Sequence, residues 1–176
     1  GEIWKIHTVD TFDYFKEPVR SKLLEKNLRK VAPFGGKIDY DVDGRLVGNW
    51  FVEGTGGYKG LGNWNYWVTH LSIVYDGLDP EHIVVSIGEF EGRGEQFGVK
   101  GNAPNPKDVG VGTLVKYELV PYDYYSGNAK WDGINYAEDI KARNTDEVRG
   151  TALFELTEAR KLKAEFFPKK SANEVS

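Results

Sequence analysis

From residue 37 to residue 167, apolar and polar side chains repeatedly alternate with a period of two, which is the pattern of half-buried β-strands. Turn-forming pairs such as Asp43-Gly44 and Asp79-Pro80 interrupt the alternation at short intervals. The pattern predicts strands at residues 37–42, 45–53, 66–76, 83–90, 113–121, 149–157 and 162–167. Sequential strands joined mostly by short turns are typical of an antiparallel up-and-down barrel or a strongly bent sheet, so a mainly β fold is expected.

The segment before these strands has a different character. Residues 3–9 predict a short strand, and residues 11–28 predict a helix. Pro18 suits an early helical turn, and Val19 and Leu23 recur at helical spacing. We expect this N-terminal helix to pack on the barrel or to close one end of it.

Length and composition limit the class of protein. The 176 residues contain no linker, so one domain is expected, comprising a lead-in (1–36), a β region (37–167) and a tail (168–176). The net charge is -4 without a basic stripe, which argues against nucleic-acid binding. The chain has no Cys for thiolate metal sites, and no apolar run approaches the roughly 20 residues that span a membrane. It also lacks Met, which indicates a start inside a longer product or after a cleaved segment.

Residues 39–44 read Asp-Tyr-Asp-Val-Asp-Gly and admit two interpretations. Asp39, Asp41 and Asp43, followed by glycine, begin as a calcium-binding loop does. Alternatively, the aspartates line the outer face of a strand, and Asp43-Gly44 forms a tight hairpin turn. The twelfth position of a calcium loop would be Trp50 instead of a bidentate glutamate, which favours the hairpin. We expect folding to require no cofactor, although these aspartates could bind calcium.

Aromatic residues gather on connections that are rich in glycine and asparagine. Aromatic rings beside amide groups suit stacking on sugar rings or on other flat apolar groups. We expect an accessible groove at one end of the barrel, lined by Tyr58, Trp64, Trp67, Tyr124 and Tyr125. The simpler alternative is that these rings pack the barrel ends.

His70 is the candidate for catalysis. If Leu71 faces the core, His70 and Ser72 face the opposite side of the same strand. A hydrolase or lyase with its active site in the barrel mouth would combine His70 with Glu89 and Glu118. The more ordinary interpretation is a structural histidine beside solvated strand carboxylates. No nucleophile elbow, phosphate loop or dinucleotide fingerprint is present.

Two resemblances add to this reading. Gly48-Asn49-Trp50 resembles the Gly-x-Trp signature of lipocalin-like barrels, which implies an eight-stranded barrel with a buried Trp50 and a small ligand; the second motif of that family is absent. Four short blocks of this chain lie at residues 11–15, 36–39, 48–51 and 162–165. Together they are similar to the C-terminal region of uncharacterised secreted bacterial proteins that carry an M23 peptidase-like domain. This second resemblance implies an extracellular or periplasmic location and an upstream domain, and it transfers no catalytic residue.

Three functions therefore remain open. The first is a non-catalytic barrel that binds a carbohydrate or a small amphipathic molecule. The second is the hydrolase or lyase, which requires acid, base or nucleophile groups that converge in one pocket. The third is a structural or assembly module of a larger secreted protein, which requires a flat apolar patch or an unpaired edge strand.

Overall fold

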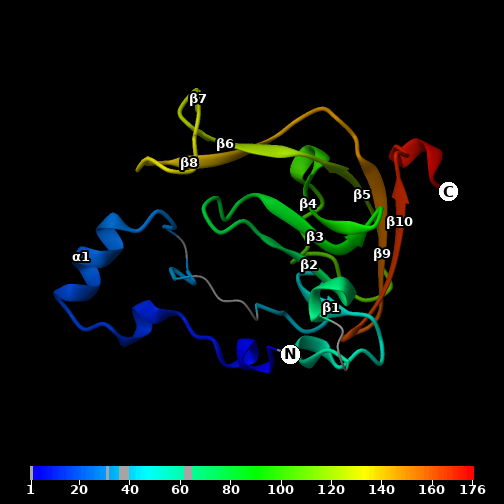
Figure 1. Ribbon diagram of the computed structural model, residues 1–176, viewed down its shortest axis with the longest axis horizontal. Helices are drawn as coiled ribbons and strands as arrows, with labels where there is room; N and C mark the ends of the chain where they lie inside the picture. The colour runs from blue at the N-terminus through cyan, green and yellow to red at the C-terminus, as the bar shows by residue number, and fades with distance from the viewer. Residues whose placement is uncertain (1, 31, 36–39, 62–64) are drawn as a thin grey trace.

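The computed structural model describes residues 2–30, 32–35, 40–61 and 65–176. Within these ranges the chain is mainly β, as predicted, and a seven-stranded antiparallel sheet curls into a nearly closed barrel (Figure 1). In sheet order its strands are β1 (Gly48–Phe51), β2 (His70–Tyr75), β3 (Ile83–Phe90), β4 (Arg93–Val99), β5 (Leu114–Val120), β9 (Gly150–Glu158) and β10 (Lys161–Pro168). A second, three-stranded sheet contains β7 (Ala129–Lys130), β6 (Tyr122–Ser126) and β8 (Ile140–Asn144).

The barrel interior is filled by side chains. Strand alternation turns Leu71 and Ile73 of β2 inward, where they lie opposite Ile87 and Val85 of β3. Trp50 of β1 is only 7% exposed and belongs to the same core, which confirms the prediction that it is buried. Because the core is packed in this way, any ligand site must be sought at the barrel surface or along its edges.

Tight turns set the strand pairing. Glu91-Gly92 joins β3 to β4, and both residues have positive φ, 52° and 87°, as a two-residue turn matched to strand twist requires. β4 was not predicted, because its glycines and charged residues do not resemble a strand core. The predicted strands 149–157 and 162–167 are confirmed as β9 and β10, which pair with each other.

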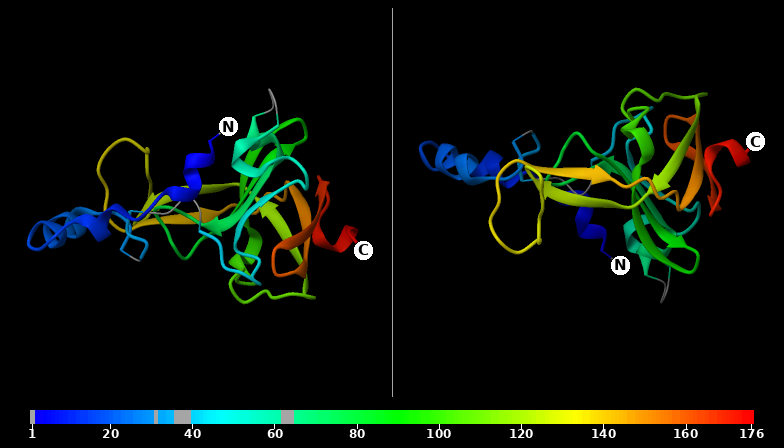
Figure 2. Two further views of the ribbon diagram at one scale, coloured as in Figure 1. Left: turned by 90° about the horizontal axis from the view of Figure 1, so that it is seen from below. Right: turned by 90° about the horizontal axis from the view of Figure 1, so that it is seen from above.

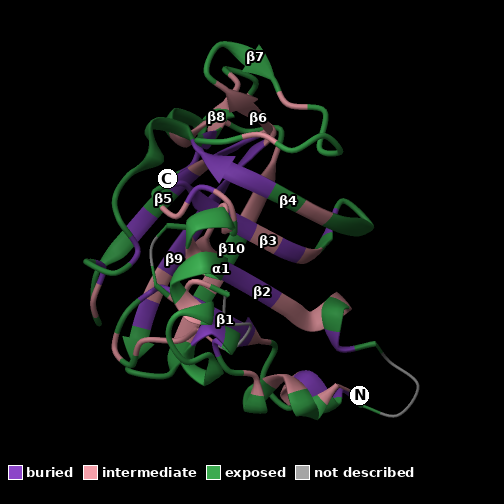
Figure 3. Cartoon of the chain, turned by 90° about the vertical axis from the view of Figure 1, so that its left-hand side faces the viewer, coloured by how far each residue is buried: buried purple, intermediate pink, exposed green. Residues whose placement is uncertain are grey.

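The N-terminal segment contains the predicted helix, but over shorter bounds and with different neighbouring elements. The expected strand at residues 3–9 is a 3-10 helix, η1 (Ile3–His7), and the expected helix at 11–28 is divided into η2 (Thr11–Tyr14) and α1 (Val19–Lys26). Proline disfavours helical conformation in the preceding residue, and Pro18 caps α1 instead of lying within it. No residue of α1 is buried (Figure 3), and the helix stands away from the barrel instead of packing on it (Figure 2).

Other predicted elements also changed. Residues 37–39 lie outside the described residues, and 40–42 form no strand. Asp43-Gly44 does lie in a turn, with the N–H of Arg45 donating to the carbonyl of Val42 (3.0 Å), yet β1 begins only at Gly48, so no hairpin forms there. The first residues of predicted strand 66–76 form η4 (Tyr66–Thr69) instead. The remaining 3-10 helices are η3 (Gly57–Lys59), η5 (Lys100–Asn102) and η6 (Ala172–Glu174).

The three-stranded sheet is inserted between β5 and β9, so the topology is not a simple up-and-down meander. It includes β8, which lies in a segment for which no strand was predicted. Asp79, in the β2–β3 connection, accepts hydrogen bonds from the Lys141 ammonium and the Ala142 N–H, both 3.0 Å, and so joins this sheet to the barrel. No helix in the described ranges is long and apolar enough to cross a membrane.

Candidate functional site

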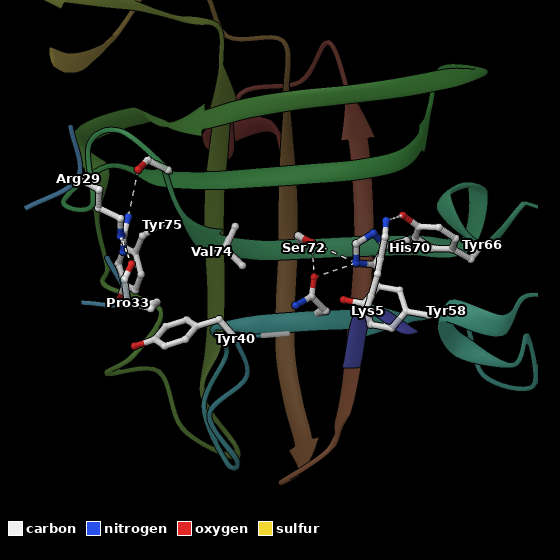
Figure 4. Close-up of a pocket in the computed structure, with 12 residues that line it drawn as sticks. Lys5, Arg29, Pro33, Tyr40, Tyr58, Tyr66, His70, Ser72, Val74 and Tyr75 are labelled. Carbon is white, nitrogen blue, oxygen red and sulfur yellow. Dashed lines mark hydrogen bonds between the residues drawn. The ribbon is translucent and has the colours of Figure 1, made fainter. Parts of the chain in front are cut away.

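A pocket of about 290 Å³ lies on the outer face of β1 and β2, between these strands and the N-terminal segment (Figure 4). Its lining includes Tyr40, Tyr58, Tyr66 and Tyr75, and we call it the tyrosine pocket. Three polar side chains, Asn49, His70 and Ser72, line its floor, and two cations, Lys5 and Arg29, lie towards opposite ends.

Strand geometry explains the floor. In β2 the residues Leu71 and Ile73 point into the core, so His70 and Ser72 point outward, as the sequence analysis predicted. Asn49 precedes Trp50 on β1 and therefore faces the same outer side, directly opposite Ser72 in the register. The three polar groups are thus positioned by two adjacent strands of the barrel.

A hydrogen-bond network orients these groups. The Asp41 carboxylate accepts from the backbone N–H of Asn49 (2.7 Å) and from its side-chain Nδ2 (3.2 Å). Nδ2 therefore faces Asp41, and the amide oxygen Oδ1 faces β2. There Oδ1 accepts from the Ser72 hydroxyl (2.7 Å) and lies 3.0 Å from His70 Nε2. Because an amide oxygen only accepts, Nε2 carries the imidazole proton.

The imidazole of His70 is neutral at neutral pH. Burial, helped by the positive charge of Lys5, lowers the pKa of His70 from 6.5 to about 4, although Asp41 acts in the opposite direction. The ring also stacks on Phe51, with centroids 4.8 Å apart and planes 20° apart. His70 therefore presents a fixed polar ring and is poorly suited to act as a general base at neutral pH.

The aromatic end of the pocket lies beside η3 and η4. Tyr58 and Tyr66 are both buried, with ring centroids 5.4 Å apart. Lys5 donates to the Tyr66 hydroxyl and forms an ion pair with Glu2 at 2.6 Å. η4 approaches β3 so closely that a Cβ on Gly88 would lie 1.6 Å from the Trp67 carbonyl oxygen, so only glycine fits there.

The structure separates the predicted aromatic residues. Tyr58 lines the tyrosine pocket, whereas Trp67, half exposed, contacts it only through Tyr66, at 5.7 Å between centroids. Trp64 lies outside the described residues. Tyr124 and Tyr125 belong to β6 in the other sheet and do not line this pocket; Tyr124 donates to the Asp76 carboxylate, and Arg143 lies 4.5 Å from the ring centroid of Tyr125.

The predicted catalytic residues are also divided. A wider cavity, about 1210 Å³, follows the gap between β1 and β10, the two ends of the barrel sheet, and we call it the seam cavity. His70 and Glu89 both line it. Glu118 does not, because it lies on β5, where it contacts Lys100 at 3.3 Å and accepts from the N–H of Ala172 at 2.9 Å.

The aspartates of the predicted calcium loop have other partners. Asp39 lies outside the described residues. Asp41 holds Asn49 and also pairs with Arg160 at 2.7 Å, and the highly exposed Asp43 lies 3.8 Å from the same guanidinium. The described residues contain no group of three or more His, Cys, Asp or Glu side chains arranged to hold a metal ion.

The sequence analysis did not name Lys5, Arg29, Asn49 or Tyr66 as site residues. Strand alternation could have identified Asn49 as outward-facing, since it precedes the buried Trp50 on the same strand. The contribution of Lys5 depends on a contact across 61 residues with Tyr66, which no local pattern reports. No protein-family model, curated protein or solved structure matches the chain.

Proposed function

We propose that this domain is a non-catalytic binding module that takes a carbohydrate or a small amphipathic molecule in the tyrosine pocket, outside the cytoplasm and as part of a larger secreted protein. The observation that carries the proposal is the convergence of four tyrosines on a polar floor of Asn49, His70 and Ser72. Tyrosine rings offer flat apolar faces with polar edges, and the floor supplies groups that orient hydroxyls.

Binding is favoured over catalysis by the chemistry of the floor. The Ser72 hydroxyl donates to Asn49, and His70 Nε2 is itself protonated, so the imidazole nitrogen near Ser72 has no lone pair with which to activate the hydroxyl. The described lining contains no carboxylate that could replace His70 as a base. Fixed donors and acceptors without an activated nucleophile are what a binding site requires.

The test is a titration by isothermal calorimetry with cellotetraose, chitotetraose and, below its micelle concentration, dodecyl maltoside. At least one should bind saturably. Tyr40→Ala should weaken that binding by about fivefold, because one stacking contact contributes about 1 kcal/mol. Tyr136→Ala is the matched control, since this tyrosine is 69% exposed and lies outside the pocket. Absence of saturable binding, or equal effects of the two substitutions, would refute the proposal.

A further inference from the structure

The charge of the tyrosine pocket is one-sided. Among its described lining residues two are cationic, Lys5 and Arg29, and none is acidic. The chain as a whole has a net charge of -4, so this excess of positive charge is local to the pocket. A cleft lined by charge of one sign concentrates ligands of the opposite sign.

The two cations are not equivalent. Lys5 is neutralised by Glu2, which lies 2.6 Å away. Among the described residues, Arg29 donates only to backbone carbonyls, from Nε to Pro33 (2.9 Å) and from Nη1 to Asp76 (2.8 Å) and Gly77 (3.5 Å). These bonds hold the guanidinium in place, leave its charge without a carboxylate partner among the described residues, and leave Nη2 as a remaining donor.

Lys107 adds a second positive charge near the Arg29 end. Its ammonium lies 5.3 Å from the ring centroid of Tyr40 and 4.9 Å from that of Tyr75, and both rings line the pocket. It forms no ion pair with any described residue. The nearby Asp76 carboxylate is directed elsewhere, since it accepts from the Tyr124 hydroxyl and the backbone N–H of Leu78 (2.8 Å).

We propose that the tyrosine pocket selects an acidic sugar, whose carboxylate binds at the Arg29 and Lys107 end while its ring stacks on Tyr40 or Tyr75. This inference rests on the proposed binding function and specifies its ligand class. A sugar fits better than a hydrocarbon chain because the described lining is rich in hydroxyl, amide and imidazole groups and includes few aliphatic side chains, Val74 and Pro33. Guanidinium groups bind carboxylates with strong, charge-assisted hydrogen bonds.

The test compares tetragalacturonate with its fully methyl-esterified form, which has the same rings and linkages without the charges. Calorimetry at about 50 mM salt should show roughly tenfold or greater preference for the acid, and the preference should shrink at about 500 mM salt because screening shortens the range of charge interactions. Arg29→Gln should reduce the preference several-fold, because Lys107 remains, and should leave binding of the ester in place. Lys163→Gln, which removes one charge from β10 outside the tyrosine pocket, should change neither.

The outcomes separate this inference from the proposed function. Equal affinity for the acid and the ester in the wild-type protein would overturn the inference while the binding function stands. Failure of the acid, the ester and the neutral ligands to bind would overturn both. If Arg29→Gln lowers the melting temperature, Lys107→Gln tests the site of carboxylate binding instead, because the Lys107 ammonium contacts only ring faces among the described residues. An unchanged preference for the acid in Lys107→Gln overturns the assignment of the carboxylate to this end of the pocket.

Discussion

Replacement of Trp50 by alanine tests whether this residue is part of the barrel core. Trp50 is 7% exposed, contacts the central core and donates from Nε1 to the Leu46 carbonyl at 3.1 Å. On the solvent side, the Arg160 guanidinium lies 5.1 Å from its ring centroid. Trp50→Ala removes all three interactions at once and leaves a cavity under β1.

The size of the effect follows from these contacts. An aromatic side chain buries about 150–250 Å². At about 25 cal/mol per Å² this amounts to about 4–6 kcal/mol, of which alanine retains a part. The expected loss in free energy of unfolding is therefore about 3–5 kcal/mol. Trp50→Phe keeps most of the ring but leaves the buried Leu46 carbonyl without its donor, so it should cost about 1–3 kcal/mol.

The assay is urea denaturation followed by far-UV circular dichroism, which does not depend on the tryptophan signal. Trp67→Ala is the matched control, because Trp67 is 50% exposed, and it should cost less than about 1 kcal/mol. The expected order of destabilisation is Trp50→Ala, then Trp50→Phe, then Trp67→Ala. A midpoint for Trp50→Ala equal to that of the wild-type protein, or a larger effect of Trp67→Ala, would refute the assignment of Trp50 to the core.

Two further predictions concern the site. Gly88→Ala should displace η4, because the new Cβ would overlap the Trp67 carbonyl oxygen. The substitution should weaken ligand binding and lower stability by about 1–3 kcal/mol, measured by titration and by denaturation. Gly94→Ala is the control in both assays, since its Cβ would make ordinary contacts at 3.6 Å. The depressed pKa of His70 means that the unfolded chain binds more protons between pH 6.5 and about 4, so its contribution to stability is complete above pH 6.5 and is lost as pH falls through this window. His70→Gln should flatten the dependence of unfolding free energy on pH, which amounts to about 1.4 kcal/mol per pH unit for each proton. The same slope in the variant and in the wild-type protein would show that His70 does not titrate as described.

The barrel strands that the sequence predicted best are those with one face in the core. β3, β5, β9 and β10 lie within a residue or so of their predicted bounds, because burial of alternate side chains leaves a local signal. β4 leaves no such signal over most of its length, and its position depends on the turn at Glu91-Gly92. The chain returns as a strand after this turn because it pairs with β3, and no local pattern reports that pairing.

The N-terminal helix was predicted, but its bounds and its packing on the barrel were not. Apolar residues at helical spacing usually mark a face that packs on a core, yet no residue of α1 is buried. The helix and its break at Pro18 follow from local rules, but the separation of α1 from the barrel leaves no signal in the pattern of apolar residues.

The sequence predicted the strand side of the candidate site and Tyr58, but not its N-terminal side. Alternation of side chains along β2 placed His70 and Ser72 on the outer face. The same alternation applied to β1 would have placed Asn49 beside them. The opposite side of the pocket comes from Lys5 and Arg29, which precede every strand and which only the folded chain brings to the tyrosines. This division has a physical consequence for mutagenesis: changes in the strand floor alter hydrogen bonds within the barrel and should affect stability together with binding. Changes in the cations of the N-terminal segment act on groups outside the core and should affect binding more than stability, and that separation is the behaviour expected if these residues serve a ligand instead of the fold.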